Sequence, residues 1–121
     1  RAPTHAVARF TLGVAQMRSG LVGEAFASFR VSLDVAGDNL SLLRTLGTEA
    51  LDAGQLWLAV DALTRAVELD ARSALTWLAK ARAHRARGEQ ERAREAYSRA
   101  LALDAGNEAV RLELDSLTSV R

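Results

Sequence analysis

Side chains that commonly carry catalysis or hold metal ions are few and scattered in this sequence. Its two histidines, His5 and His84, have no further metal ligand at a suitable spacing, and the chain has no cysteine. The eight glycines occur singly, so no glycine-rich phosphate loop is present. The carboxylates Glu91 and Glu95 share a helix face that solvent can reach. We therefore expect no catalytic site, no bound metal and no cofactor.

Basic side chains are the other candidates for chemistry, and residues 73–87 concentrate them. This stretch contains no acidic residue and four cations: Lys80, Arg82, Arg85 and Arg87. Such a cluster can attract an acidic segment of a partner. The whole chain carries a net charge of only +1, and no Phe, Trp or Tyr lies among the four cations. A nucleic-acid-binding surface usually has a higher positive charge with aromatic residues among the cations. We therefore expect a protein or peptide partner instead.

The composition indicates an all-helical chain. Alanine and leucine dominate, isoleucine is absent, and the one proline is Pro3. No stretch is apolar enough for membrane insertion, and no leader-like segment lies near the N-terminus. A cytoplasmic location is favoured and a periplasmic one stays open. Fifteen of the sixteen basic residues are arginine, a usage typical of GC-rich bacterial genes, and the start at Arg1 suggests a piece of a longer protein.

An internal repeat of 34 residues organises the sequence. One of its columns is glycine in all three copies, another is alanine in all three, and three others keep the same spacing with related residues. The five columns are Gly20, Gly54 and Gly88; Ala25, Ala59 and Ala93; Phe29, Leu63 and Tyr97; Leu33, Val67 and Leu101; and Gly13, Gly47 and Ala81. A period of this length is the signature of stacked helical units that bury their apolar faces against one another.

Each copy divides into two stretches with helical periodicity. They predict helices at residues 4–19, 22–36, 39–53, 56–70, 73–87 and 90–104, and a seventh at 107–120. Residues suited to cap the helix starts are Thr4, Asp38 or Asn39, Ser73 and Asn107. The glycines of the Gly20 column follow helix ends, where a left-handed residue closes the turn without a steric penalty.

Two glycines are predicted in the middle of helices, at Gly13 and Gly47. Glycine there costs about 1 kcal/mol relative to alanine, so a close approach of the second helix must offset the loss. We expect the small residue of that helix, Ala25 or Ala59, to face the glycine. The large residues of the Phe29 column are then expected between neighbouring helix pairs.

The pattern resembles the tetratricopeptide repeat, a 34-residue helix–turn–helix unit with the signature W-x2-L-G-x2-Y followed by Ala, an aromatic residue and Pro. The second copy matches with Leu46, Gly47, Ala59, Leu63 and Ala66, and the third with Trp77, Ala81, Ala93, Tyr97 and Ala100. Lys80 stands in the Leu column of the signature and His84 in its Tyr column, so we expect His84 to be packed and not to bind a metal. The closing Pro is absent from all three copies.

The resemblance implies an all-α fold, a right-handed α-solenoid of three helix–turn–helix units. As a single domain over residues 1–121, it would hold repeats at 6–39, 40–73 and 74–107 and a capping helix at 108–121. Asp115 falls in the Gly13 column, and a carboxylate there is costly to desolvate in a close helix contact. No partner helix is therefore expected to follow. The cap has an apolar stripe of Val110, Leu114 and Leu117.

The resemblance also implies a function as a protein–protein interaction module, an adaptor or scaffold that binds a peptide or protein segment. In this family the first helix of each unit lines a concave groove, along which peptides lie. The groove columns fall on Val7, Phe10, Val14, Met17 and Arg18; on Ser41, Arg44, Thr45, Thr48, Leu51 and Asp52; and on Leu75, Leu78, Ala79, Arg82 and Arg85.

Two interpretations of the charges in this groove stay open. In one, a peptide places an apolar end on the first copy and an acidic end at Arg82 and Arg85. In the other, Glu49 or Asp52 on the preceding helix neutralises both arginines. Family members that grip the C-terminal carboxylate of heat-shock chaperones use Lys, Asn, Asn, Lys and Arg at fixed columns. Those columns here hold Phe10, Val14, Thr45, Leu75 and Ala79, so no such clamp is expected.

Further alternatives remain at this point. The chain is also compatible with a structural spacer within a longer repeat protein, or with a non-catalytic region attached to an enzyme, and self-association stays open. Trp57 is the one aromatic residue that the repeat does not require. A partner contact at Trp57 and its partial burial against a neighbouring loop are equally supported.

Overall fold

The computed structural model describes the backbone of residues 2–119 and the side-chain surroundings of residues 5–117. This part of the chain forms seven α-helices and no strand. They are α1 (Ala2–Arg18), α2 (Val22–Val35), α3 (Leu40–Asp52), α4 (Leu56–Leu69), α5 (Ala74–Ala86), α6 (Gln90–Leu103) and α7 (Glu108–Ser119). Every helix starts within two residues of its predicted start. The predicted end of the last helix, at residue 120, lies outside the described residues.

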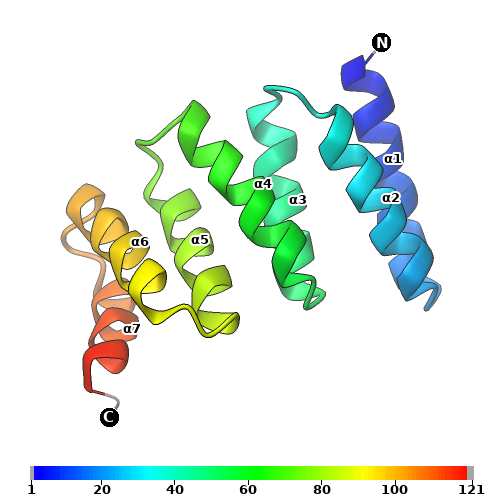
Figure 1. Ribbon diagram of the computed structural model, residues 1–121. Coiled ribbons are helices and arrows are strands. Elements are labelled where there is room, and N and C mark those ends of the chain that lie inside the picture. The colour runs from blue at the N-terminus through cyan, green and yellow to red at the C-terminus, as the bar shows by residue number, and fades with distance from the viewer. Residues whose placement is uncertain (1, 120–121) are drawn as a thin grey trace.

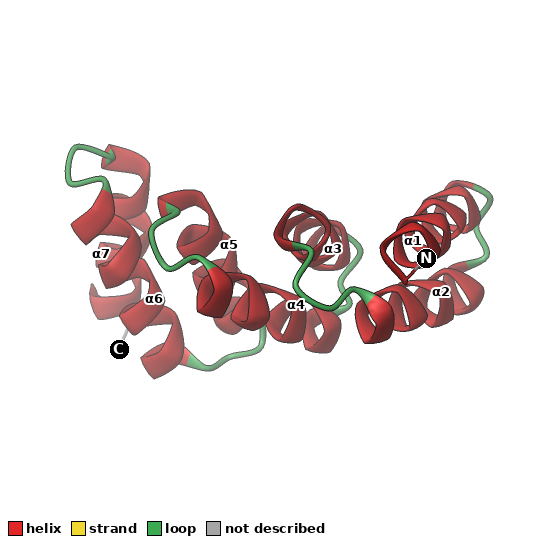
Figure 2. Cartoon of the chain, turned by 90° about the horizontal axis from the view of Figure 1, so that it is seen from above, coloured by secondary structure: helices red, strands yellow, loops and turns green. Residues whose placement is uncertain are grey.

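The helices form three antiparallel pairs, α1–α2, α3–α4 and α5–α6, and α7 follows against the last pair (Figure 1). Seen from above, α1, α3 and α5 form one layer of the array and α2, α4 and α6 form the other (Figure 2). This is the right-handed α-solenoid that the repeat predicts. No described helix has the length and the apolar character needed to cross a membrane.

Capping residues set the starts of three helices. The side chains of Asn39, Ser73 and Asn107 accept hydrogen bonds from the backbone N–H groups of the first turns of α3, α5 and α7. The predicted cap at Thr4 is wrong for the start of α1, because that helix already begins at Ala2. The turns within the three pairs each contain one glycine at φ of 81° to 83°, as the Gly20 column predicts.

The mid-helix glycines make room for a side chain of their own helix pair. A Cβ atom on Gly47 would lie 2.4 Å from the Cγ of Leu63, and one on Gly13 would lie 2.6 Å from the Phe29 ring. The close approach of the two helices is therefore confirmed. Phe29 and Leu63 fill the space over these glycines, which was not predicted, and Leu63 also lies beside Leu75 and Ala79 of the next pair, as predicted. The carbonyl oxygen of Ala25, on the second helix, lies 3.3 Å from the added Cβ on Gly13.

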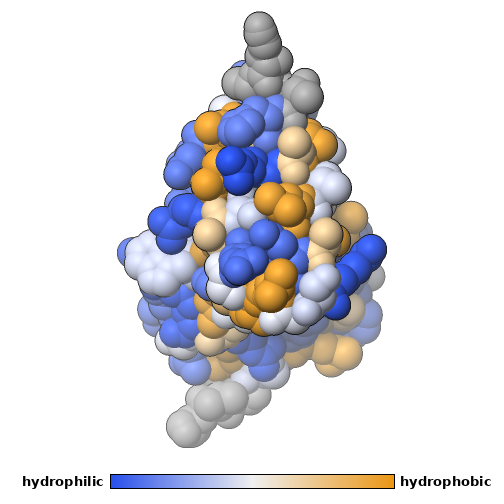
Figure 3. Space-filling model, turned by 90° about the vertical axis from the view of Figure 1, so that its right-hand side faces the viewer, coloured by the Kyte–Doolittle hydropathy of each residue, from blue (hydrophilic) through white to orange (hydrophobic). Residues whose placement is uncertain are grey.

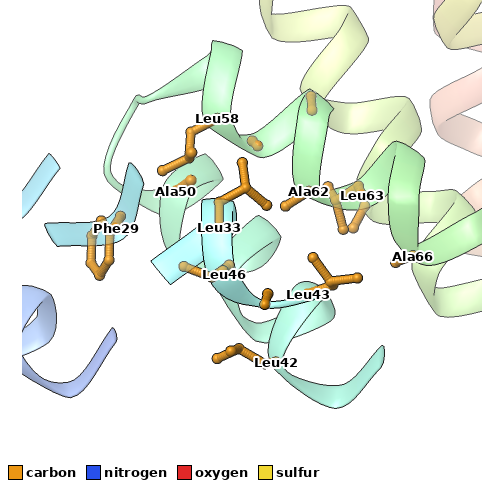
Figure 4. Packing of buried hydrophobic residues seen from close by; sticks show 14 of the residues in the cluster. Phe29, Leu33, Leu42, Leu43, Leu46, Ala50, Leu58, Ala62, Leu63 and Ala66 are labelled. Atoms are coloured by element: carbon orange, nitrogen blue, oxygen red, sulfur yellow. The ribbon is translucent and has the colours of Figure 1, made fainter. Parts of the chain in front are cut away.

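Two apolar clusters run through the array. The first joins α1 to α5, and Figure 4 shows Leu33 of α2 reaching toward Leu46 and Leu58 within it. The second joins α4 to α7 and includes Val110 and Leu117 of α7, with Leu114 packed against it. The predicted apolar stripe of the last helix is therefore confirmed. Asp115, on the same helix, is exposed.

Candidate binding groove

The predicted groove residues of the first two copies lie at least partly at the surface. Among them, Val7, Arg18, Ser41, Thr45, Thr48 and Asp52 are exposed, and Phe10, Val14, Met17, Arg44 and Leu51 are half-buried. In the third copy Leu75 is 75% exposed, whereas Leu78 and Ala79 are buried. All of these residues belong to α1, α3 and α5, which lie in one layer (Figure 2).

A small apolar pocket opens between α3 and α5. It has a volume of about 80 Å³ and is lined by Arg44, Thr48, Leu63, Leu75, Thr76 and Ala79, and its surface is almost wholly apolar. The hydroxyl of Thr48 donates to the backbone carbonyls of Arg44 or Thr45, so its hydrogen is already engaged. The α3–α5 pocket therefore has an apolar interior, and Arg44 is the one charged residue of its lining.

Arg44 keeps its charge free of internal neutralisation. It is half-buried, and within the described residues it forms no ion pair and no side-chain hydrogen bond. Glu49 and Asp52 lie on the same helix but do not pair with it. An arginine in this position can offer two parallel N–H donors to a carboxylate.

Arg82 is in the opposite situation. Its Nε and Nη2 atoms donate to the two carboxylate oxygens of Glu113 on α7, at 3.1 Å and 2.6 Å. The hydroxyl of Tyr97 donates to the same carboxylate at 2.8 Å. The hydrogen bond from Arg82 holds the pKa of Glu113 below its usual value, and burial raises the pKa of Tyr97. The expectation that Glu49 or Asp52 neutralises Arg82 is wrong, because α7 provides the acid.

Arg85 is also engaged by α7. Its guanidinium donates to the hydroxyl of Ser116 at 3.0 Å. The α5–α7 contact thus takes up both arginines that the sequence placed at the cationic end of the groove. A peptide carboxylate would have to compete with Glu113 for Arg82.

A constant spacing explains this difference. Arg82 and Glu113 are 31 residues apart, and so are Arg85 and Ser116. Arg44 and Leu75, which border the same pocket, have the same spacing. A residue on one first helix therefore meets the residue 31 positions later on the next first helix. The repeat columns alone do not reveal this spacing, which pairs Arg82 with an acid and sets Arg44 and Leu75 beside the same pocket.

The first helix pair presents an apolar surface broken by polar groups. Phe10 packs on Phe29 with 5.7 Å between ring centroids. Val7, Leu12, Leu21 and Val22 remain substantially exposed. Figure 3 shows that apolar areas at this end of the array are separated by hydrophilic ones and do not merge into one patch.

The two histidines and Trp57 were the other candidate residues in the sequence. His84 is buried, with its Nδ1 2.7 Å from a carboxylate oxygen of Glu89, which confirms a packed histidine. His5 is exposed. Trp57 is 66% exposed, and the Arg87 guanidinium lies 4.9 Å from its ring centroid. Among the described residues no three His, Asp or Glu side chains gather closely enough to hold a metal ion.

Comparisons with known proteins agree with this architecture. The sequence profile described as tetratricopeptide repeat matches residues 23–114. The first such domain of Spaghetti (RPAP3), solved with an HSP90 peptide, has a TM-score of 0.71 at 20% identity, covering 95% of this chain and 91% of that one. The second domain of human RPAP3, in complex with an HSP70 peptide, has a TM-score of 0.75 at 18% identity, covering 99% of this chain and 100% of that one.

A third similar structure is the MamA protein, with a TM-score of 0.75 at 23% identity. The match covers 93% of this chain and 62% of that chain. Curated protein sequences give no significant match. At these identities the solved structures establish the fold alone, while the family profile spans most of the sequence. The chain therefore belongs to the tetratricopeptide repeat family.

Proposed function

We propose that this chain is a protein-interaction module that holds a peptide or protein segment along the layer of α1, α3 and α5. The observation that carries the proposal is the α3–α5 pocket, an apolar recess with the unneutralised Arg44 in its lining. The proposed contact residues are Phe10, Val14, Met17, Arg18, Arg44, Thr48, Leu51, Leu78, Arg82 and Arg85.

The chemistry of the pocket defines the segment that it suits. A recess of about 80 Å³ accepts one aliphatic side chain, whose burial contributes roughly 1.5–3 kcal/mol. The guanidinium of Arg44 then suits a carboxylate next to that side chain, through a charge-assisted and bidentate contact. The preferred ligand is therefore an aliphatic residue beside an acidic one. This places the acidic end of the ligand at the centre of the array.

The first helix pair would extend the contact. Phe10, Val14 and Met17 are half-buried apolar side chains on the same layer, so they suit further apolar residues of the segment. Arg82 and Arg85 would take part only if the ligand displaced Glu113 or Ser116. For that reason we propose that Arg44 makes the main contact with the acidic residue of the ligand.

The solved relatives support peptide binding as a use of this fold. Two of them contain peptides of heat-shock proteins, as their descriptions state. The residues that would form a chaperone carboxylate clamp are replaced in this chain, among them Thr45 and Leu75. We therefore propose that this chain binds a class of peptide other than the chaperone C-termini, recognised by one apolar recess and one arginine.

Selection from a random peptide display library against the whole chain tests the proposal. Selected peptides should contain an aliphatic residue next to Asp or Glu, and Arg44→Glu should weaken their binding at least tenfold, measured by fluorescence polarisation. The matched control is Arg30→Glu, which reverses an exposed charge on α2 in the other layer. Circular dichroism checks that both variants keep their helices. The proposal fails if no peptide is enriched, or if Arg44→Glu and Arg30→Glu bind the selected peptides equally well.

A further inference from the structure

Lys80 is the only lysine of the chain, and its position is unusual. It stands in the column of Leu12 and Leu46, and Leu46 is fully buried. A half-buried ammonium therefore replaces an aliphatic core side chain in the third copy. Removing a charged group from water is costly unless something in its surroundings compensates it.

A second pocket opens beside this ammonium, between α4, α5 and α6. Its volume is about 280 Å³, and its polar lining consists of Thr64, Lys80, His84, Arg92 and Glu95. By helical spacing Lys80 lies on the side of α5 away from Leu75 and Arg82. The α4–α6 pocket is therefore distinct from the groove.

The contacts of Lys80 leave its charge incompletely compensated. The ammonium lies 5.1 Å from the centroid of the Trp77 ring, and the guanidinium of Arg99 lies 5.3 Å from the same centroid. Within the described residues no carboxylate forms an ion pair with Lys80. Burial lowers the pKa of Lys80 from its usual value, and the more distant Glu95 and Glu68 offset this only in part.

Other polar groups of the lining are also unengaged. The side chains of Thr64 and Arg92 form no hydrogen bond or ion pair with the described residues. His84 uses its Nδ1 for the contact with Glu89. Glu95 is the one acid of the lining, so its positive groups outnumber its negative ones.

We propose that the α4–α6 pocket binds a small oxyanion of the size of phosphate. Lys80 would be the main ligand, with the guanidinium of Arg92 and the hydroxyl of Thr64 as further donors. The anion would supply the counter-charge that the protein itself does not place beside the ammonium. This site is independent of the peptide groove, so either proposal can fail without the other.

Titration with inorganic phosphate at constant ionic strength tests this site. In a Trp57→Phe background Trp77 is the only tryptophan, and its fluorescence should change in a saturable way at phosphate concentrations on the order of 1 mM. Phosphate should also protect Lys80 from amine acylation, which mass spectrometry detects on the single lysine-containing peptide. Acetate should act more weakly, because it carries one negative charge.

Three variants complete the test. Lys80→Leu restores the residue of its column, so it should fold at least as stably as the parent and lose the phosphate response. Glu95→Gln removes the opposing charge and should tighten phosphate binding roughly threefold or more. Arg111→Gln, an exposed site on α7, is the control and should bind phosphate as the parent does. The proposal is overturned if phosphate gives no saturable response, or if Lys80→Leu leaves that response unchanged.

Discussion

The contacts that α5 makes with α3 and with α7 follow one register and have opposite consequences. Between α5 and α7 the register joins Arg82 to Glu113, and Tyr97 donates to the same carboxylate. Between α3 and α5 it sets Arg44 and Leu75 beside the same apolar pocket. The charge of Arg82 is thus paired within the chain, whereas that of Arg44 has no acid partner among the described residues.

The difference shows how a repeat fold can separate stability from binding. The backbone spacing is common to both contacts, so the side chain 31 positions after each arginine decides whether that arginine is structural or available. A basic residue on the groove layer is thus not by itself a binding residue. Three substitutions test this difference, beginning with the one expected to change stability most.

Gly47 lies against Leu63, which lines the α3–α5 pocket, and its replacement should cause the largest loss of stability. Gly47→Ala places a Cβ 2.4 Å from the Cγ of Leu63, which must therefore shift. We expect a loss of about 1–3 kcal/mol in the free energy of unfolding, measured by urea denaturation. The matched control is Gly23→Ala on α2, where an added Cβ meets nothing within 4 Å and alanine should stabilise by about 0.5–1 kcal/mol. Equal effects of the two substitutions would contradict the close packing of Leu63 on Gly47.

Glu113→Gln should make the α5–α7 contact resemble the α3–α5 contact. It removes the negative charge from Arg82 and should cost about 1 kcal/mol, since the Arg82 side chain is 47% exposed and solvent screens the pair. The pKa of Glu113 is depressed in the fold, so its contribution is fully present above the usual value of 4.5 and is lost as pH falls below it.

The stability difference between parent and Glu113→Gln should therefore shrink as the pH falls from 6 to about 3. Chemical denaturation at each pH measures it. A difference that stays constant over this range would show that the Arg82–Glu113 pair does not provide the effect.

Leu75→Glu installs an acid 31 positions after Arg44 and should pair with that arginine. We expect a small gain in stability, of roughly 0–1 kcal/mol, because the new pair lies near the surface. The variant should also no longer bind the peptides that were selected against the parent chain. Leu75→Met, which keeps an apolar wall, should retain them. Tight peptide binding by Leu75→Glu would place the ligand elsewhere.

The periodicity was sufficient to predict the helices and their order. Glycines and capping residues mark the ends of helices through their own local chemistry. The turn at Gly54 and the helix start at Ser73 were therefore predicted correctly. The apolar stripe of α7 was also predictable, because Val110 and Leu117 repeat the apolar spacing.

The groove was predicted less completely, for a physical reason. Columns show which residues share a layer, but the neutralisation of a charge depends on contacts between helices of different copies. Glu113 lies on the last predicted helix, outside the columns considered for the groove, so its hydrogen bonds to Arg82 were not foreseen. The contact of Leu63 with Gly47 was also not foreseen, since repeat spacing does not show which way a side chain points.

A charge exchange between protein and peptide tests the central claim most directly. Affinities are measured for the parent and Arg44→Glu, each with a selected peptide and with its acid-to-lysine variant. The account predicts that each single change weakens binding at least tenfold and that the double exchange restores affinity to within about threefold of the parent pair. Independent losses with no recovery, together with a tenfold loss for Arg82→Glu, would contradict it and move the acidic contact to the α5–α7 end.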